Sequence, residues 1–207
     1  MKKTILILSL ITLFFAGCKK DDIFEKGDMG VVDGHFCVDL GLPSGLKWAT
    51  CNVGATSPEA YGDYFAWGET TTKAEYTSVN CKTYDKTMND ISGNAQYDAA
   101  RANWGGDWRM PTYDELNELR TKCTWTWTTQ NGVNGYKVTG PSGASIFLPA
   151  AGCRQGASLN NAGNYGGYWR STPYGSSSAI YLYFDSSSHG VSSSHRYLGR
   201  TVRPVIE

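Results

Sequence analysis

Tyr181-Leu182-Tyr183-Phe184-Asp185, near the C-terminal end, is the stretch that decides the fold. Its residues alternate, so Leu182 and Phe184 share one face of an extended chain, while the two tyrosines and the aspartate share the other. This period of two predicts a half-buried β-strand. We expect Leu182 and Phe184 to face the core and Tyr181, Tyr183 and Asp185 to face solvent.

The segment around this strand has the composition of a binding surface. Residues 153–201 contain 11 Ser, 6 Tyr, 7 Gly and 3 Asn, the four types that dominate antibody-like paratopes. A flexible Ser/Gly-rich tail is the alternative interpretation. However, such a tail would lack apolar residues like Trp169, Ile180 and Val191. We therefore expect a folded display surface.

Two short helices are predicted before this segment. Asn94 to Trp104 has helical propensity and ends before two glycines. Thr112 and Glu115 form a capping box after a proline, which predicts a second helix to about Lys122. Glu115 and Glu118 lie three residues apart on that helix, and a solvated face explains this spacing better than a catalytic carboxylate pair.

Strands are predicted on both sides of the helices. Residues 38–53 and 136–148 read as hairpins with Pro/Gly turns, and residues 61–67 as a short aromatic strand. Residues 70–93 and 186–195 are polar and irregular, and residues 201–205 form a final strand. Helices in the first half and strands in the second predict an α+β domain with much irregular structure.

The N-terminus has the pattern of a lipoprotein signal. Two lysines precede an apolar run from Ile5 to Phe15, and Ala16-Gly17-Cys18 follows. The run is too short to span a bilayer as a helix. We expect residues 1–17 to be a signal peptide, Cys18 to be lipidated, and residues 18–34 to tether a domain at 35–207 to the membrane.

Charge and cysteine usage exclude several functions. The chain has 19 basic and 19 acidic side chains, so it lacks the basic field that nucleic-acid binding needs. Neither cysteines nor histidines have zinc-ligand spacing, and we expect no metal and no cofactor. Export to an oxidising compartment makes disulfides plausible, and Cys51 with Cys123 is the favoured pair because both lie beside Trp-rich segments.

Several motifs resemble a large paralogous family of secreted proteins and lipoproteins of Bacteroidetes and Fibrobacter. The blocks that match are Val38–Gly45, Trp48–Ala55, Tyr61–Glu69, Trp108–Thr112, Phe147–Gly152 and Val202–Pro204. This resemblance covers about residues 36–206. It implies the C-type lectin fold in its formylglycine-generating-enzyme version, with two short helices packed on antiparallel hairpins.

Some members of this family resemble the target proteins of diversity-generating retroelements, in which a C-terminal variable region is rewritten at adenine-rich codons. The resemblance implies that residues 153–201 are such a region. The predicted ligand-binding residues are Arg154, Arg170, Tyr174, Tyr181, Tyr183, Asp185, His189, Ser192, Ser193, Ser194, His195, Tyr197 and Arg200. Tyrosines would be the anchors and arginines would supply planar hydrogen-bond forks.

These observations favour a non-enzymatic binding protein at the outer membrane, on the cell surface or on the periplasmic face, that recognises a protein or glycan ligand. A glycan-binding surface lipoprotein is one alternative. Calcium-mediated sugar binding is poorly supported, because Asp185 is the only acidic residue between Cys153 and Arg203. An enzyme of the formylglycine-generating type is the other alternative, but the cysteine pair of those enzymes is not matched here.

Overall fold

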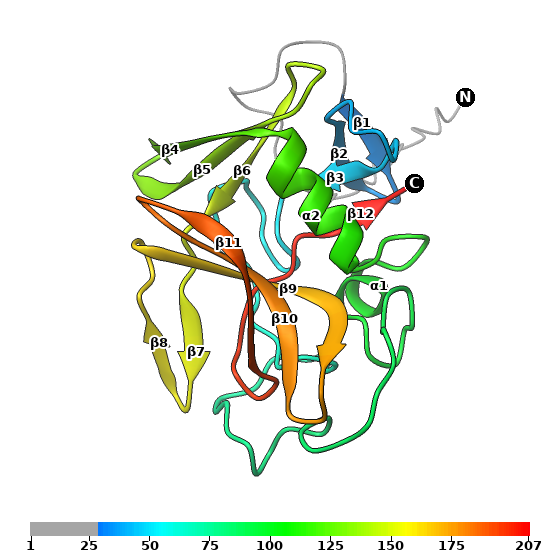
Figure 1. Ribbon diagram of the computed structural model, residues 1–207, viewed down its shortest axis with the longest axis vertical. Coiled ribbons are helices and arrows are strands. Elements are labelled where there is room, and N and C mark those ends of the chain that lie inside the picture. Colours follow the sequence, from blue (N-terminus) through cyan, green and yellow to red (C-terminus); the bar gives the residue numbers. More distant parts are fainter. Residues whose placement is uncertain (1–28) are drawn as a thin grey trace, which may run out of the picture.

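The computed structural model describes residues 29–207. This part of the chain contains two short helices and twelve short strands (Figure 1). In chain order they are β1 Met29–Val32, β2 His35–Asp39, β3 Lys47–Ala49, α1 Ala99–Trp104, α2 Tyr113–Lys122, β4 Thr124–Gln130, β5 Val133–Thr139, β6 Ser145–Pro149, β7 Cys153–Gln155, β8 Ser158–Asn160, β9 Tyr165–Tyr174, β10 Ser178–Asp185, β11 His189–His195 and β12 Val205–Ile206.

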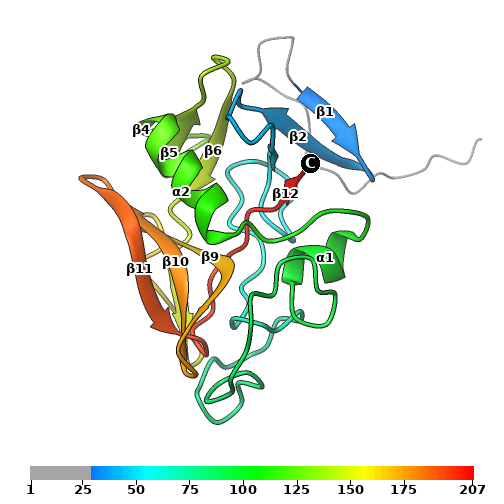
Figure 2. The ribbon, with the colours of Figure 1, turned by 45° about the vertical axis from the view of Figure 1, so that its right-hand side comes forward.

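The strands form four sheets, in the orders β1-β2-β3-β12, β4-β5-β6, β9-β10-β11 and β7-β8. Every pairing within them is antiparallel. Figures 1 and 2 both show α2 lying between the β4-β5-β6 sheet and the β9-β10-β11 sheet. The prediction of an α+β domain with two short helices and antiparallel hairpins is confirmed.

The two ends of the described chain meet in one sheet. The predicted hairpin at 38–53 forms from β2 and β3, and its turn is closed by Gly45 N donating to Leu42 O at 2.9 Å. The C-terminal strand β12 adds to β3 with Val205 opposite Trp48. This last strand begins four residues later than the predicted 201–205.

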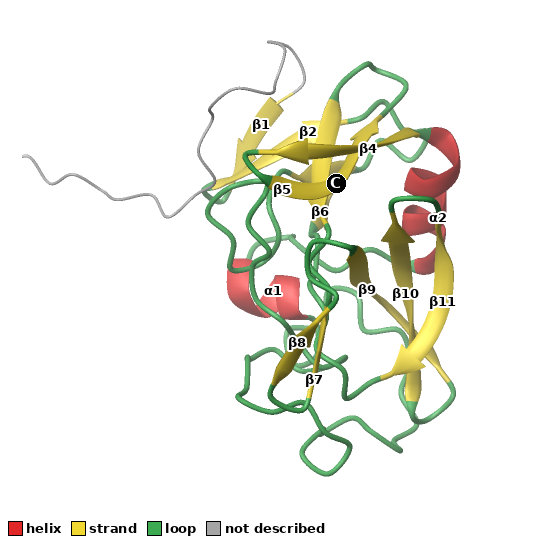
Figure 3. Ribbon diagram, turned by 90° about the vertical axis from the view of Figure 1, so that its left-hand side faces the viewer, coloured by secondary structure: helices red, strands yellow, loops and turns green. Residues whose placement is uncertain are grey.

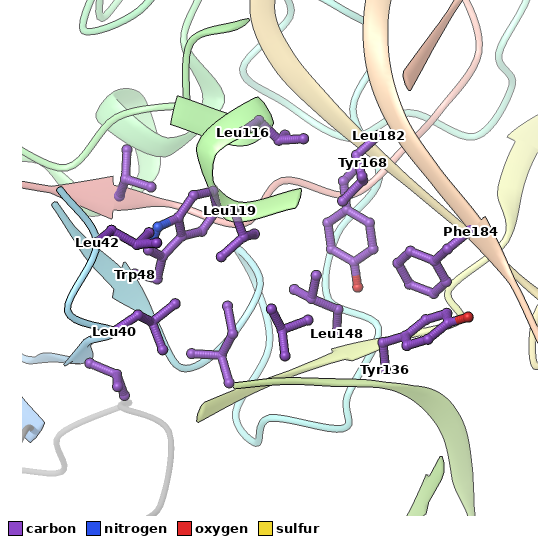
Figure 4. Close-up of a cluster of buried hydrophobic side chains, with 14 of the residues drawn as sticks. Leu40, Leu42, Trp48, Leu116, Leu119, Tyr136, Leu148, Tyr168, Leu182 and Phe184 are labelled. Carbon is purple, nitrogen blue, oxygen red and sulfur yellow. The ribbon is translucent and has the colours of Figure 1, made fainter. Parts of the chain in front are cut away.

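Helix α2 begins as its sequence predicts. Thr112 is the N-cap, and the side chains of Thr112 and Glu115 make the reciprocal bonds of a capping box. Leu116 and Leu119 are buried in the main core, a cluster shared by three sheets. Figure 4 shows both leucines between Trp48 of β3 and Tyr168 of β9. The apolar side of α2 therefore holds these sheets together.

Glu115 differs from the expected solvated carboxylate. Its two oxygens accept hydrogen bonds from Arg109 at 2.8 and 2.7 Å. This bidentate pair and the bond from Thr112 N hold the pKa of Glu115 below its usual value, although burial acts in the opposite direction. The carboxylate thus fixes the turn before α2.

A second core joins the loop-rich region around α1 to the β9-β10-β11 sheet. It contains Phe65, Trp67, Trp169 and Val202 among its buried residues. Indole groups cross-link the two parts, because Trp67 Nε1 donates to Arg170 O and Trp169 Nε1 donates to Phe65 O, each at 2.8 Å. Figure 3 shows the long loops that these contacts hold around α1.

Three further predicted elements differ from the structure. Residues 61–67 form no strand and make one bridge, between Phe65 and Arg200. Helix α1 starts at Ala99 rather than at 94, because the buried carboxylate of Asp98 caps it by accepting from Ala100 N and Arg101 N. Residues 189–195, predicted as loop, form strand β11.

The predicted N-terminal segments lie mostly outside the described residues. The signal peptide at 1–17, the lipidated Cys18 and most of the tether belong to residues 1–28. The last part of the predicted tether, Met29–Val32, forms strand β1 and pairs with β2. Among residues 29–207, no helix is both long enough and apolar enough to span a membrane.

The predicted disulfide between Cys51 and Cys123 is wrong, because Cys123 is a free thiol. Cys123 ends α2 and packs against the main core, while Cys51 is buried after β3. Nearby tryptophans correctly indicated burial of Cys51, whereas Cys123 is only partly buried. A disulfide also requires Cβ atoms about 4 Å apart, which proximity to a common core does not provide.

Candidate binding surface

The alternation in β10 has the predicted register. Leu182 and Phe184 are buried in the main core, and Tyr181 and Tyr183 lie on the opposite face of the strand. Tyr183 is partly exposed, as expected. Tyr181 is only 9% exposed and packs in the second core, so its predicted exposure is wrong. The reason is that the guanidinium of Arg200 covers its ring at 3.7 Å.

We define the tyrosine face as Tyr165, Tyr181, Tyr183, Ser192 and Ser194. Register places Ser192 directly opposite Tyr181, and Ser194 opposite Ala179 on the same side of the sheet. Tyr165 at the start of β9 reaches the same side, because its hydroxyl lies 3.0 Å from the hydroxyl of Tyr181. The tyrosine face is thus built from three neighbouring strands, β9, β10 and β11.

The rings of the tyrosine face are arranged by glycines on both neighbouring strands. Gly167 and Gly190 flank Tyr183 across the sheet. A Cβ at Gly190 would lie 2.7 Å from the Tyr183 hydroxyl, so only glycine gives the ring this position. The freed space lets Tyr165 and Tyr183 stack with centroids 6.5 Å apart and planes within 4°.

The phenol of Tyr165 remains neutral at physiological pH. Burial raises the pKa of Tyr165, and its hydrogen bond with Tyr181 raises that pKa further. A neutral hydroxyl both donates and accepts hydrogen bonds. The tyrosine face therefore offers the flat apolar area of its rings together with hydroxyl groups that can donate or accept hydrogen bonds.

Arg200 lies beneath this face rather than on it. It is 4% exposed, and its Nη2 donates to Ser194 Oγ at 3.1 Å. Its Nε and Nη1 have no hydrogen-bond partner among the described residues. The prediction of a solvent-facing fork at Arg200 is wrong, because the side chain is held between the rings of Tyr181 and Trp169.

Arg170 is also a buried residue and not part of the tyrosine face. Its side chain is fully buried, and Tyr113 covers the guanidinium at 3.9 Å. Nη1 donates to Tyr113 O at 3.3 Å. Burial lowers the pKa of Arg170 to about 10. The expected solvent-facing fork at Arg170 is therefore wrong, because the side chain is fully buried.

Three further predicted residues have local structural contacts. The His189 ring stacks on Trp125 at 4.5 Å, and burial lowers its pKa. The Asp185 carboxylate accepts hydrogen bonds from the following turn, at Ser187 and Ser188. Ser193 is exposed, but on the face of β11 opposite to Ser192 and Ser194.

The remaining predicted residues lie at other edges of the molecule. His195 and Tyr197 stack at 5.2 Å and form an aromatic group with Tyr84. Tyr174 is 61% exposed at the β9–β10 turn. Arg154 in β7 lies over the ring of Tyr64. The sequence-predicted residues therefore occupy several separate places, of which the tyrosine face gathers the most.

Sequence reasoning missed two kinds of residue here. Tyr165 was not predicted as a ligand contact, although the Gly166-Gly167 pair after it was a signal of close ring packing. Arg196 and Arg203 were not recognised as buried residues. Both are at most 2% exposed and donate to backbone carbonyls. No local pattern distinguishes them from surface arginines.

Metal ligands do not cluster in the described part of the chain. No three His, Cys, Asp or Glu side chains lie together among residues 29–207 as a metal site would require.

A protein-family profile described as a domain of unknown function (DUF8237) matches residues 115–205. The matched segment extends from the first turn of α2 to the start of β12 and contains the whole tyrosine face. Searches among curated proteins and among solved structures give no match.

Proposed function

We propose that the chain is a membrane-anchored, non-enzymatic binding protein that recognises a protein or another macromolecule through the tyrosine face. The observation that supports this most is the pair of partly exposed, stacked rings of Tyr165 and Tyr183. Rigid aromatic side chains lose little conformational entropy on binding and contribute a large share of the energy at interfaces.

The surroundings of these rings support the same role. Exposed Ser192 lies on the neighbouring strand and offers an adaptable hydroxyl. Buried Trp169 and Arg200 lie below, so the rings rest on packed side chains. A preorganised surface of this kind binds more tightly, because less order has to be gained when the ligand arrives.

We further propose the C-type lectin fold in its formylglycine-generating-enzyme version, with Cys18 as the lipid anchor. The motif resemblance at 36–206 supports this assignment, as does the antiparallel arrangement with two short helices. Residues 153–201 would be the diversified region. A neighbouring reverse-transcriptase gene and a near-copy of the 3′ coding region would support diversification. Protease shaving of intact cells would test exposure of the domain at the cell surface.

Site-specific photocrosslinking tests the binding role directly. A photoreactive phenylalanine analogue is placed at Tyr183 in the full chain, and in a matched chain at Tyr113, a half-exposed tyrosine outside the tyrosine face. Both chains are exposed to cell-surface protein fractions, and adducts are identified by mass spectrometry. We expect a discrete adduct at position 183 that is missing at 113. Equal labelling at both positions would contradict selective binding.

Alanine substitution complements this experiment. Tyr183→Ala should remove the adduct captured by a probe at Tyr165 and change thermal stability little, because the Tyr183 ring is partly exposed. Tyr181→Ala is unsuitable as the test, because that ring is buried in the second core and its loss would destabilise the domain. An unchanged adduct in Tyr183→Ala would count against the tyrosine face.

A further inference from the structure

A large open pocket lies in the loop region, away from the residues of the tyrosine face. Its volume is about 660 Å³, and its walls come from segments 68–71, 82–91 and 94–97. These segments lie in the teal and green loops of the lower half of Figure 1. Sites for small molecules usually have volumes of roughly 300–1,000 Å³. We call this feature the loop pocket.

Arg196 fixes one wall of the loop pocket. Its buried guanidinium donates from Nη1 to Thr83 O at 2.9 Å and to Lys86 O at 2.8 Å. Nη2 donates to Gly175 O at 2.7 Å, and the group stacks on Trp67 at 4.4 Å. One side chain therefore ties the wall segment to the β9–β10 turn and to the second core.

Asp98 fixes the part of the wall around residues 91–94. Its buried carboxylate accepts from Gly93 N at 2.7 Å and from Met110 N at 2.8 Å, besides capping α1. Ile91 N donates to Ser171 O at 3.2 Å, which attaches the same wall to β9. An irregular loop held in this way is preformed, so a ligand need not order it.

The lining of the loop pocket is mostly uncharged and polar. Hydroxyl and amide groups line it, from Thr70, Thr71, Thr87, Asn89, Asn94 and Gln96. The side-chain amides of Asn89 and Gln96 are exposed and have no hydrogen-bond partner among residues 29–207. Each amide can donate and accept at once. Such groups suit a ligand that also presents donors and acceptors together, as a sugar does with its hydroxyls.

The charges of the lining are balanced. Lys82 and Lys86 are opposed by Glu69 and Asp90. The Glu69 carboxylate is already engaged, because it accepts from Lys82 N at 2.7 Å and pairs with Lys73 Nζ at 2.9 Å. The lining itself has a net formal charge of zero, because two basic side chains are matched by two acidic ones.

An apolar patch completes the site. Tyr97 and Met88 are half-buried and pack against the second core, and both line the loop pocket. The flat apolar face of a sugar ring can pack on such a patch while its hydroxyls reach the surrounding amides. We propose that the loop pocket binds an uncharged polyhydroxylated small molecule of mono- or disaccharide size. This second site is independent of the function proposed for the tyrosine face.

Titration calorimetry and saturation-transfer NMR on the full chain test the proposal. The probes are glucose, galactose, mannose, N-acetylglucosamine and maltose, with inorganic phosphate as the anionic probe. We expect at least one sugar to bind. The double variant N89A/Q96A should bind it at least about tenfold more weakly, because two neutral hydrogen-bonding groups are lost. The matched control N160A/Q155A removes two exposed amides from the β7-β8 hairpin and should keep full affinity.

Each possible result of these binding experiments either supports or overturns the proposed sugar site. Loss of affinity in N89A/Q96A with an unchanged melting temperature, and retention in Tyr183→Ala, supports a sugar site separate from the tyrosine face. Failure of every sugar to bind at 20 mM, or equal affinity in N89A/Q96A and the control, overturns it. Phosphate binding that competes with or replaces sugar binding also overturns it, because the ligand class would then be anionic.

Discussion

Arg203 offers the sharpest test of how this fold is held together. Its fully buried guanidinium donates to Asn52 Oδ1 at 2.9 Å and to three backbone carbonyls. Those carbonyls belong to Ala49 at the end of β3 and Thr50 directly after it, at 3.0 and 2.6 Å, and to Phe147 of β6, at 2.9 Å. Burial lowers its pKa to about 10, so it stays protonated at neutral pH. One cation therefore joins two sheets.

Arg203→Met keeps an unbranched side chain about as long as the aliphatic stem of arginine and removes the guanidinium with all four bonds. Each bond to a charged group contributes about 1.5–3 kcal/mol, so the gross loss is roughly 6–12 kcal/mol. Releasing a buried charge returns several kcal/mol. We expect a net loss of about 4 kcal/mol in the free energy of unfolding, a large part of the roughly 5–15 kcal/mol typical of domains. Lysine should recover little, because one ammonium cannot reach both sheets.

Urea unfolding followed by tryptophan fluorescence measures this effect. With a slope of about 2 kcal/mol per M, the midpoint of Arg203→Met should fall by roughly 2 M. The control is Arg154→Met, which removes a half-buried arginine from β7 and should shift the midpoint by less than about 0.5 M. A shift in Arg203→Met as small as that of the control would refute the bridging role.

Three further predictions concern single side chains. Burial lowers the pKa of His189 from 6.5, so the stabilising contribution of the neutral ring is complete above pH 6.5 and is lost as pH falls. Between pH 7.5 and pH 5, the melting temperature of His189→Phe should therefore drop less than that of wild type. Equal drops in the two proteins would contradict this prediction. Burial raises the pKa of Cys123 to about 11, so about one thiol in a thousand is ionised at pH 8. After iodoacetamide treatment, mass spectrometry should show Cys153 labelled well before Cys123. Faster labelling of Cys123 would be evidence against a protected Cys123 thiol. A Cβ at Gly167 would overlap Nη1 of Arg200. Gly167→Ala should therefore lower the free energy of unfolding by about 1–2 kcal/mol in the wild-type background and by less in the Arg200→Ala background. Additive losses in the double variant would exclude the clash.

Local signals in the sequence predicted the elements whose structure depends on local interactions. The capping box at Thr112 and Glu115 fixed the start of α2, because both partners lie within one turn. The alternation of Leu182 and Phe184 placed the correct face of β10 in the core. In each case the interaction that forms the element lies within a few residues.

Strand β11 could not be predicted in the same way. Its sequence from His189 to His195 is rich in serine and has one apolar residue, Val191. The strand forms because its backbone pairs with β10 along seven residue pairs, and not because its own side chains are buried. Such a strand depends on a partner at its side, and a single sequence does not reveal that partner.

The sequence also does not distinguish arginines that are buried in the core from arginines that could contact a ligand. Arg170 and Arg200 were predicted to be exposed, and both are buried. Composition alone makes an arginine among serines and tyrosines resemble a paratope residue. Only the three-dimensional contacts show that such an arginine faces inward. For example, the guanidinium of Arg170 lies against the ring of Tyr113.

The buried arginines also differ from one another in a way that bears on the proposed function. In both Arg196 and Arg203, all three guanidinium nitrogens donate hydrogen bonds to oxygen atoms of the protein. Arg200, directly under the tyrosine face, leaves Nε and Nη1 without a partner among the described residues. An unpaired buried donor costs about 1–3 kcal/mol. Arg170 also has two unpaired buried nitrogens, Nε and Nη2, and each of these two guanidinium groups lies over a tyrosine ring. Cation–π contact offsets part of the cost at both positions, and at Arg200 it supports the Tyr181 ring of the face that we propose meets the ligand.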